Sequence, residues 1–183
     1  MHISRSSFMR ATALAAVLAG TQLALSGCAV SVPPGVEPVS HFDLHRYLGT
    51  WYEIARLDHS FERGLERVSA NYTPRDDGGV KVINRGYNPQ KQQWQESIGK
   101  AYFIGSPQQA SLKVSFFGPF YGGYNVIDLD DKYQHALIAG PNRDYLWILS
   151  RTPTIDTQTR DRLVAVAKNY GFPVDQLIWV KQE

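Results

Sequence analysis

The stretch Gly49-Thr50-Trp51-Tyr52, paired with Trp147-Ile148-Leu149-Ser150-Arg151 about a hundred positions later, decides the fold. Between the two lie short runs with the alternation of β-strands, separated by glycine, proline, asparagine and aspartate. If eight such strands close into an up-and-down barrel, the first and the eighth become antiparallel neighbours. We therefore expect the Arg151 guanidinium to lie on the Trp51 indole and to close one end of the barrel. The first strand begins at this end, directly after Gly49.

The turn residues place the eight strands and one helix along the chain. The turns between strands are short, which favours antiparallel neighbours over parallel crossovers of a dozen residues or more. A helix begins at Thr154 or Asp156, ends at Gly171 and carries one apolar stripe, so it should pack outside the barrel. The prediction is an all-β fold, an eight-stranded antiparallel up-and-down β-barrel with one C-terminal α-helix packed outside. The strands are expected near residues 50–57, 67–73, 79–87, 92–104, 111–116, 122–129, 133–139 and 145–151, with an edge strand at 177–180.

Residues 1–27 have the pattern of a secretory signal peptide, with two arginines, a short apolar run and small residues at its end. A transmembrane helix is the alternative, but the run falls short of the ~20 apolar residues that a bilayer span needs. The run ends in Leu25-Ser26-Gly27-Cys28, which resembles the lipobox of bacterial lipoproteins, whose cysteine is acylated. An incidental cysteine is the other interpretation. We expect residues 28–40 to be a lipidated, extended tether and residues 41–183 to be the folded domain.

Composition excludes some classes of function. Cys28 is the one cysteine of the chain, so no disulfide can form within it. The formal net charge of +2 comes from the two arginines of residues 1–27, which leaves the rest of the chain neutral. Binding of nucleic acid relies on clustered lysines and arginines, so we expect no nucleic-acid partner.

Strand alternation predicts which side chains face the interior. Because neighbours on a strand point to opposite faces, an inward Arg151 also turns Trp147 inward. On the first strand the same rule turns Glu53 and Ala55 inward with the indole. A buried carboxylate needs a partner, and the nearest choices for Glu53 are Arg56 and Arg151.

The motifs resemble those of the lipocalin family, in particular its bacterial outer-membrane lipoproteins and animal apolipoprotein D. The first family motif matches Tyr-Leu-Gly-Thr-Trp-Tyr-Glu-Ile-Ala-Arg at 47–56, and the third matches 147–151. The second, Thr-Asp-Tyr in the family, is reduced to Leu129-Asp130-Asp131-Lys132-Tyr133, which puts in doubt a receptor contact there. The resemblance implies a cavity for a fatty acid or lysophospholipid and no cofactor. The implied ligand-binding positions are Tyr72, Asn84, Phe116 and Trp147.

The resemblance implies an outer-membrane protein, anchored through acylated Cys28 on the periplasmic face, that binds or stores such lipids in membrane maintenance. Two alternatives remain open: an enzyme on the same barrel, and a structural lipoprotein whose barrel is filled by side chains. The enzyme is disfavoured because Cys28 lies outside the barrel and no Gly-x-Ser-x-Gly turn is present. A metal site is not expected, since His41 and His45 lack a nearby third ligand. A homodimer with facing mouths is left open.

The loop after the fifth strand is unusually aromatic. Phe117, Phe120 and Tyr121 surround Gly118-Pro119 at the end of the barrel opposite Trp51. They can form an apolar lip suited to lipid or membrane contact, or they can pack down as a local plug. The sequence does not separate these two possibilities.

Overall fold

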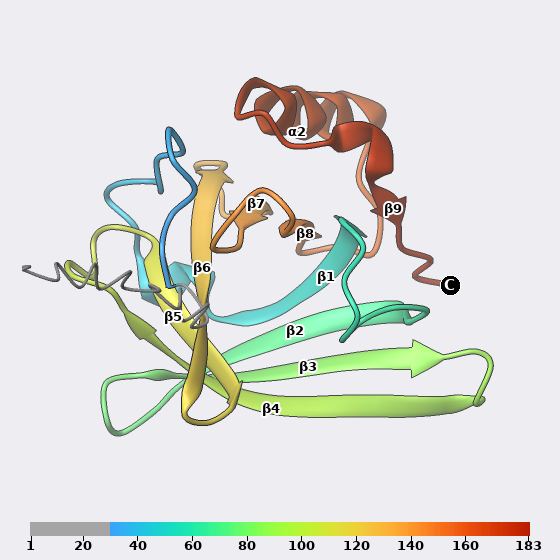
Figure 1. Ribbon diagram of the computed structural model, residues 1–183, viewed down its shortest axis with the longest axis horizontal. Coiled ribbons are helices and arrows are strands. Elements are labelled where there is room, and N and C mark those ends of the chain that lie inside the picture. The colour runs from blue at the N-terminus through green and yellow to red at the C-terminus, as the bar shows by residue number, and fades with distance from the viewer. Residues whose placement is uncertain (1–29) are drawn as a thin grey trace, which may run out of the picture.

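The computed structural model describes residues 30–183, so the predicted signal peptide and Cys28 lie outside the described residues. One antiparallel sheet has the strand order β2-β3-β4-β5-β6-β7-β8-β1-β9, and β1 pairs with both β2 and β8. The first eight strands therefore close into a barrel, as predicted, with helix α2 outside it (Figure 1). The elements are α1 (Leu44–Tyr47), β1 (Gly49–Arg56), β2 (Glu66–Pro74), β3 (Val80–Asn88), β4 (Gln93–Phe103), β5 (Ser111–Phe117), β6 (Phe120–Leu129), β7 (His135–Ala139), β8 (Leu146–Ser150), α2 (Thr157–Asn169), the 3-10 helix η1 (Val174–Gln176) and β9 (Ile178–Trp179).

The predicted strand boundaries agree with the structure to within about two residues, and β9 is the expected edge strand. The start of β7 differs for a local reason. The Asp130 carboxylate accepts hydrogen bonds from the backbone N–H groups of Lys132, Gln134 and His135. This side chain closes a turn in the place of backbone pairing, so the strand begins at His135 and not at residue 133.

Helix α2 packs on the outer face of the barrel along its apolar stripe. Asp156 is its N-cap, because the carboxylate accepts from the Thr159 N–H at 2.8 Å. Leu163 and Ala167 are fully buried against outward-facing side chains of β1, β6, β7 and β8. A separate apolar cluster fills the closed part of the barrel interior. Strands β1, β6, β7 and β8 thus have two apolar faces, one in each cluster.

One end of the barrel is closed by α1, Trp51 and Arg151. The Arg151 Cζ lies 4.0 Å from the centre of the Trp51 ring, so the predicted contact is confirmed. The buried indole donates its Nε1–H to the Tyr47 carbonyl at 2.8 Å. Gly49 has φ +94°, and a Cβ there would lie 3.4 Å from Arg151 Nη1. The arginine also donates hydrogen bonds to five backbone carbonyls, those of Arg46, Tyr47, Leu48, Thr50 and Tyr133.

The prediction that Ala55 faces the interior is wrong. The pairing of β1 with β8 shifts register between Glu53 and Ala55, which marks a β-bulge. A bulge adds one residue to a strand and reverses the alternation beyond it. Ala55 therefore belongs to the cluster under α2, and Arg56 turns inward beside Glu53.

The prediction of a free tether is wrong for residues 31–40. Val36 is buried in the outer cluster and Pro33 is fully buried. The Val39 N–H donates to the Val126 carbonyl at 2.9 Å, and the Val39 carbonyl accepts from the Ala110 N–H at 3.0 Å. The valines of this segment bury apolar area that an extended tether would expose. The folded domain thus begins near Ser31, three residues after Cys28.

Candidate functional site

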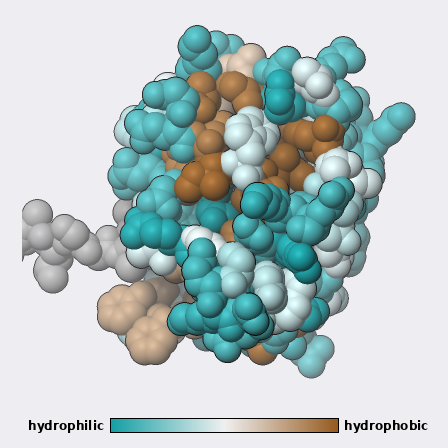
Figure 2. All heavy atoms as spheres, turned by 90° about the vertical axis from the view of Figure 1, so that its right-hand side faces the viewer, coloured by the Kyte–Doolittle hydropathy of each residue, from teal (hydrophilic) through white to brown (hydrophobic). Residues whose placement is uncertain are grey.

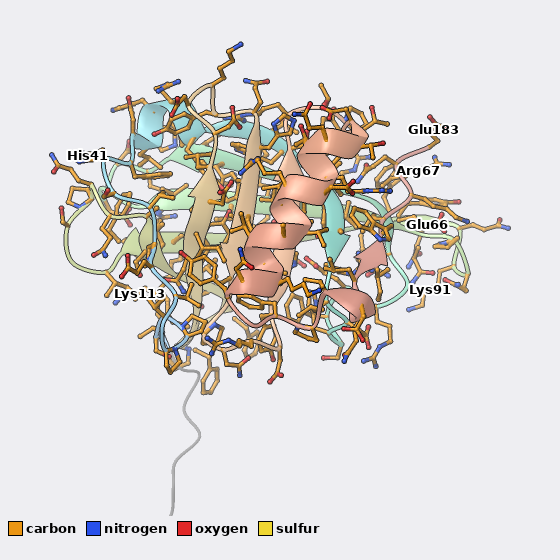
Figure 3. All side chains as sticks on the ribbon, turned by 90° about the horizontal axis from the view of Figure 1, so that it is seen from above. His41, Glu66, Arg67, Lys91, Lys113 and Glu183 are labelled. Carbon is orange, nitrogen blue, oxygen red and sulfur yellow. The ribbon has the colours of Figure 1, made fainter. Side chains whose placement is uncertain are left out.

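The barrel encloses a cavity of about 870 Å³ that opens at the end opposite Trp51. We call this end the mouth; it is rimmed by the loops β1–β2, β3–β4, β5–β6 and β7–β8 (57–65, 89–92, 118–119 and 140–145). In Figure 3, His41 near the closed end and Lys91 in the β3–β4 turn lie on opposite sides of the molecule. The deeper wall is mainly apolar, formed by residues such as Val80, Val82, Ala101, Leu112, Val114, Ile138 and Leu149. A barrel filled by its own side chains is excluded by this volume.

The four ligand-binding residues predicted from the sequence all line this one cavity, although they come from four different strands. Tyr72 is buried deep in it, and Trp147 faces it, as strand alternation predicted. The Asn84 Oδ1 is buried without a hydrogen-bond partner in the described part of the chain. Phe116 is half-exposed, at the mouth end of β5. Their contact with a ligand stays a prediction.

Three tyrosine hydroxyls meet at the floor of the cavity. The Tyr124 hydroxyl lies 2.6 Å from that of Tyr47 and 2.9 Å from that of Tyr72. Burial raises the pKa of each of the three phenols, so all stay neutral at ordinary pH. Of these three tyrosines, only Tyr72 was predicted from the sequence. Tyr47 and Tyr124 stand 77 positions apart, and no local pattern joins them.

A buried cluster of charged groups, formed by Glu53, Arg56 and Glu62, lies in the cavity wall near the mouth. Only the pairing of Glu53 with an arginine was predicted from the sequence. Arg56 is 2% exposed, and its Nη1 donates to Glu53 Oε1 at 2.6 Å, which decides between the two predicted partners of Glu53. Its Nη2 donates to the Glu62 carbonyl at 2.9 Å, which ties the β1–β2 loop to the barrel. The Glu62 carboxylate accepts from Trp147 Nε1 at 3.1 Å. The cluster thus joins the predicted ligand residue Trp147 to a loop of the mouth.

The cluster carries two carboxyl groups and one guanidinium, and burial favours the protonated form of the carboxyl groups. Burial raises the pKa of Glu53 well above its ordinary value, and the nearby Glu62 raises it further against the pull of Arg56. Burial also raises the pKa of Glu62, while the bond from Trp147 opposes this rise. A negative charge on Glu62 disfavours ionisation of Glu53, so the two carboxyl groups oppose each other's deprotonation.

His59 gives the cluster a measurable dependence on pH. It is buried and stacks on Phe61 with ring centres 3.9 Å apart. Burial, helped by the charge of Arg56, lowers its pKa from 6.5 to about 4. Between pH 6.5 and pH 4 the imidazole of His59 is protonated in the unfolded state and neutral in the folded state. The free energy of unfolding therefore falls as the pH drops from 6.5 towards 4.

We expect His59→Gln to be more stable relative to the wild type at pH 4.5 than at pH 7.5, by about 2 kcal/mol, because each unit of pKa difference is worth ~1.4 kcal/mol. Urea unfolding at both pH values measures this difference. The exposed His45 provides the matched control, His45→Gln. A stability difference between His59→Gln and the wild type that is the same at both pH values contradicts the assignment.

The aromatic loop of the mouth is a lip and not a plug. Phe117 is 78% exposed and Phe120 is 59% exposed, and both border the cavity. Tyr121 lies under the Lys113 ammonium, with Nζ 5.1 Å from the ring centre. On the opposite rim, Phe61 from the β1–β2 loop is 60% exposed. The cavity entrance is thus bordered by exposed rings on two loops.

Within residues 30–183, no group of three or more histidine, cysteine, aspartate or glutamate side chains is arranged to hold a metal ion. In the same part of the chain, no helix is long and apolar enough to cross a bilayer.

Comparison with known proteins agrees with this geometry. Residues 42–182 match the family model of the lipocalin-like domain. The outer membrane lipoprotein Blc of Escherichia coli (strain K12) is 59% identical over 174 residues, which cover 95% of this chain and 98% of that protein. The protein of the same name from Vibrio cholerae serotype O1 is 52% identical over 160 residues, covering 87% and 93%. Mouse apolipoprotein D is 28% identical over 149 residues, covering 78% of each chain.

Solved structures agree on the fold. Insecticyanin from the tobacco hornworm Manduca sexta superposes with a TM-score of 0.66 at 22% identity, covering 82% of this chain and 86% of that one. The cockroach allergen Per a 4 gives a TM-score of 0.65 at 21% identity, covering 84% and 96%. Lipocalins are binding proteins for small hydrophobic ligands and not enzymes, and an open cavity with an apolar interior is the corresponding feature of this structure. On the family-model match and the identity to its bacterial relatives, this chain belongs to the lipocalin family.

Proposed function

We propose that this protein is a lipid-anchored lipocalin of the outer membrane that holds one single-chain lipid, a lysophospholipid or a fatty acid, in its barrel. The observation that carries the proposal is a cavity of about 870 Å³ with an apolar interior, one open end and polar groups near that end. Cavities of roughly 300–1,000 Å³ are the usual size of small-ligand sites. Burial of each acyl methylene contributes ~0.8 kcal/mol, so an alkyl chain needs no polar network to bind well.

The charges of the wall favour a lysophospholipid head group over a bare carboxylate. Glu53 and Glu62 both line the cavity below the mouth, and Arg85 is a cation of the same lining that suits the phosphate of such a head group. An ionised carboxylate at Glu62 repels the carboxylate of a fatty acid, whereas it attracts an ammonium group. An ethanolamine head group placed there has its alkyl chain directed to the apolar interior. Lysophosphatidylethanolamine is therefore the ligand we expect to bind more tightly.

The anchor rests on the sequence and on the relatives. Cys28 follows Leu25-Ser26-Gly27 as the lipobox requires, and close relatives bear the name outer membrane lipoprotein. Several acyl chains on one cysteine hold a protein stably, whereas one chain holds it only reversibly. Ala29, in place of aspartate, follows Cys28, which resembles the outer-membrane outcome of lipoprotein sorting. We place the barrel on the periplasmic face, in membrane maintenance.

Quenching of tryptophan fluorescence by brominated lipid tests the proposal, because bromine quenches an indole only on contact. Trp147 lines the cavity, whereas Trp51 is buried beneath it, and Trp94 on β4 and Trp179 on β9 are half-exposed outside its lining. We expect saturable quenching at one lipid per protein, with brominated lysophosphatidylethanolamine saturating at lower concentration than brominated stearate. In Trp147→Phe most of the quenching should disappear. Quenching that does not saturate, or that persists fully in Trp147→Phe, would refute binding in the cavity.

A further inference from the structure

The β5–β6 hairpin carries the most exposed apolar side chain of the mouth, Phe117, and a second exposed ring, Phe120. Phe117 and Phe120 pair with each other across the turn. A single exposed ring is ordinary on a protein surface, but two adjacent rings at the rim of a cavity form a patch. The turn lies at the bottom of the molecule in Figure 1, and Figure 2 shows hydrophobic spheres projecting at the lower left of the surface. Nothing within residues 30–183 covers the two rings.

The described chain begins close to this hairpin. The Ser31 carbonyl accepts from Asn125 Nδ2 at 3.3 Å, and the Ser31 hydroxyl donates to the Pro141 carbonyl at 3.2 Å. A Cβ at Gly123 would lie 2.8 Å from the Ser31 oxygen, so only glycine lets the segment sit against β6 here. Gly123 is three residues from Phe120 on the same strand, which is about 10 Å.

The β7–β8 loop of the mouth also contacts this N-terminal segment, residues 31–40. The Arg143 Nη2 in the β7–β8 loop donates to the Pro34 carbonyl at 2.7 Å, and its Nε donates to the Tyr170 carbonyl at 2.7 Å. The segment then runs along β6 to the closed end, where the Phe42 N–H donates to the Gln108 carbonyl. The chain therefore enters the barrel near the mouth and not near the closed end.

The length of chain before Ser31 fixes how far the anchor can lie from the mouth. Cys28 precedes Ser31 by three residues, which span at most about 11 Å. The closed end is farther, since Leu129 at the far end of β6 lies six residues beyond Gly123, about 20 Å at a rise of roughly 3.4 Å for each residue. A bilayer that holds Cys28 is therefore within reach of the hairpin and out of reach of the β6–β7 turn.

The charge of this side of the barrel suits a membrane of anionic lipids. Between Glu96 and Asp128 the chain carries two lysines, Lys100 and Lys113, and no acidic residue. Lys113 lies over the Tyr121 ring, directly behind the two phenylalanines. Phenylalanine at the tip with tyrosine and lysine behind it matches the order of polarity from the acyl region to the head groups. Each lysine near an anionic surface adds about 1 kcal/mol of attraction.

We propose that the mouth faces the membrane and that Phe117 and Phe120 insert into the interface of the lipid bilayer. This inference rests on the lipid anchor of the proposed function and adds an orientation to it. Because both rings also border the cavity, a single-chain lipid that leaves the bilayer beside them enters the mouth without crossing water. The hairpin is then the entry route for the ligand as well as the contact with the membrane.

Site-directed fluorescence on the full-length, acylated protein tests this orientation. Because Cys28 is acylated, a cysteine introduced by Phe117→Cys is the one thiol that can carry a label such as NBD. Asp131→Cys provides the matched control, since this exposed residue lies in the β6–β7 turn, at the end of β6 opposite the β5–β6 hairpin. The protein is reconstituted into vesicles of phosphatidylethanolamine and phosphatidylglycerol that contain a phospholipid with a nitroxide on its acyl chain.

We expect quenching of the label at 117 to be about fivefold stronger than quenching of the label at 131. Equal quenching, or stronger quenching at 131, overturns the inference. A label at 117 that is shielded from both the nitroxide and an aqueous quencher also overturns it, because a second copy then covers the lip. Flotation of the protein with the vesicles reports on the anchor alone, and ligand binding is measured separately. Failure of the orientation is thus distinguishable from failure of the proposed function.

Discussion

Arg151→Ala is expected to lower the free energy of unfolding by about 3 kcal/mol or more, a large share of the 5–15 kcal/mol that typically holds a domain folded. The substitution removes the contact with the Trp51 ring, worth roughly 0.5–2 kcal/mol, and leaves five backbone carbonyls without this donor. Because α1, the start of β1 and the β6–β7 turn converge on this one guanidinium, no neighbour can replace it. Urea unfolding followed by near-ultraviolet circular dichroism measures the loss.

Arg162→Ala is the matched control for this prediction. Arg162 forms a surface ion pair with Asp128, with Nη1 and Oδ1 2.7 Å apart, and such pairs are worth about 0–1 kcal/mol. If Arg151→Ala costs no more than Arg162→Ala, Arg151 does not close the barrel in the way described. Lipid binding by Arg151→Ala should be retained under conditions where the variant is folded, because Arg151 does not line the cavity.

Val114→Trp is expected to weaken the binding of a single-chain lipid at least tenfold while the barrel stays folded. Val114 lines the cavity on β5 and is not fully buried, so an indole there enters the space that an alkyl chain needs. Each methylene that is displaced from the cavity loses ~0.8 kcal/mol, and two are enough for a tenfold effect. Isothermal titration with lysophosphatidylethanolamine measures the change in affinity, and thermal unfolding checks the fold.

Lys113→Trp is the control for the added indole. Lys113 precedes Val114 on the same strand, so its side chain points to the outer face. This variant gains the same ring and should bind the lipid as the wild type does. Equal affinity in Val114→Trp and Lys113→Trp would mean that the lipid binds elsewhere on the molecule.

Much of the fold was predictable because strand and turn chemistry are local. Glycine, proline and aspartate mark the turns, and two tryptophan motifs fix which strands become neighbours. Alternation from Arg151 placed Trp147 in the cavity wall correctly. The same rule failed at Ala55, because a bulge reverses the alternation. No residue of β1 is of a type that predicts a bulge.

The charged cluster was predictable only in part, since it depends on that bulge. Because the bulge turns Arg56 inward, its guanidinium contacts Glu53. The β1–β2 loop lies over this pair and places Glu62 and His59 beside it. One pattern was available: Glu53 with Arg56, and His59 with Glu62, are both spaced three apart. Without the bulge, Arg56 would point away from Glu53, so the pattern carried no meaning at the level of sequence.

The packing of residues 31–40 was missed because prolines suggested an extended chain. Pro33 and Val36 instead find the outer cluster, and Gly123 leaves room for Ser31 on β6. These contacts join segments about ninety positions apart, and local sequence patterns do not predict them. The correction matters for function, because it shortens the free chain after Cys28 to a few residues.

Native mass spectrometry of the protein with lysophosphatidylethanolamine tests the central claim, that one lipid occupies the barrel cavity, most directly. We expect a single added mass of one lipid on the wild type and on Lys113→Trp, and the unliganded mass on Val114→Trp. A wild-type protein that carries no lipid, or a Val114→Trp protein that carries as much as the wild type, would contradict the claim.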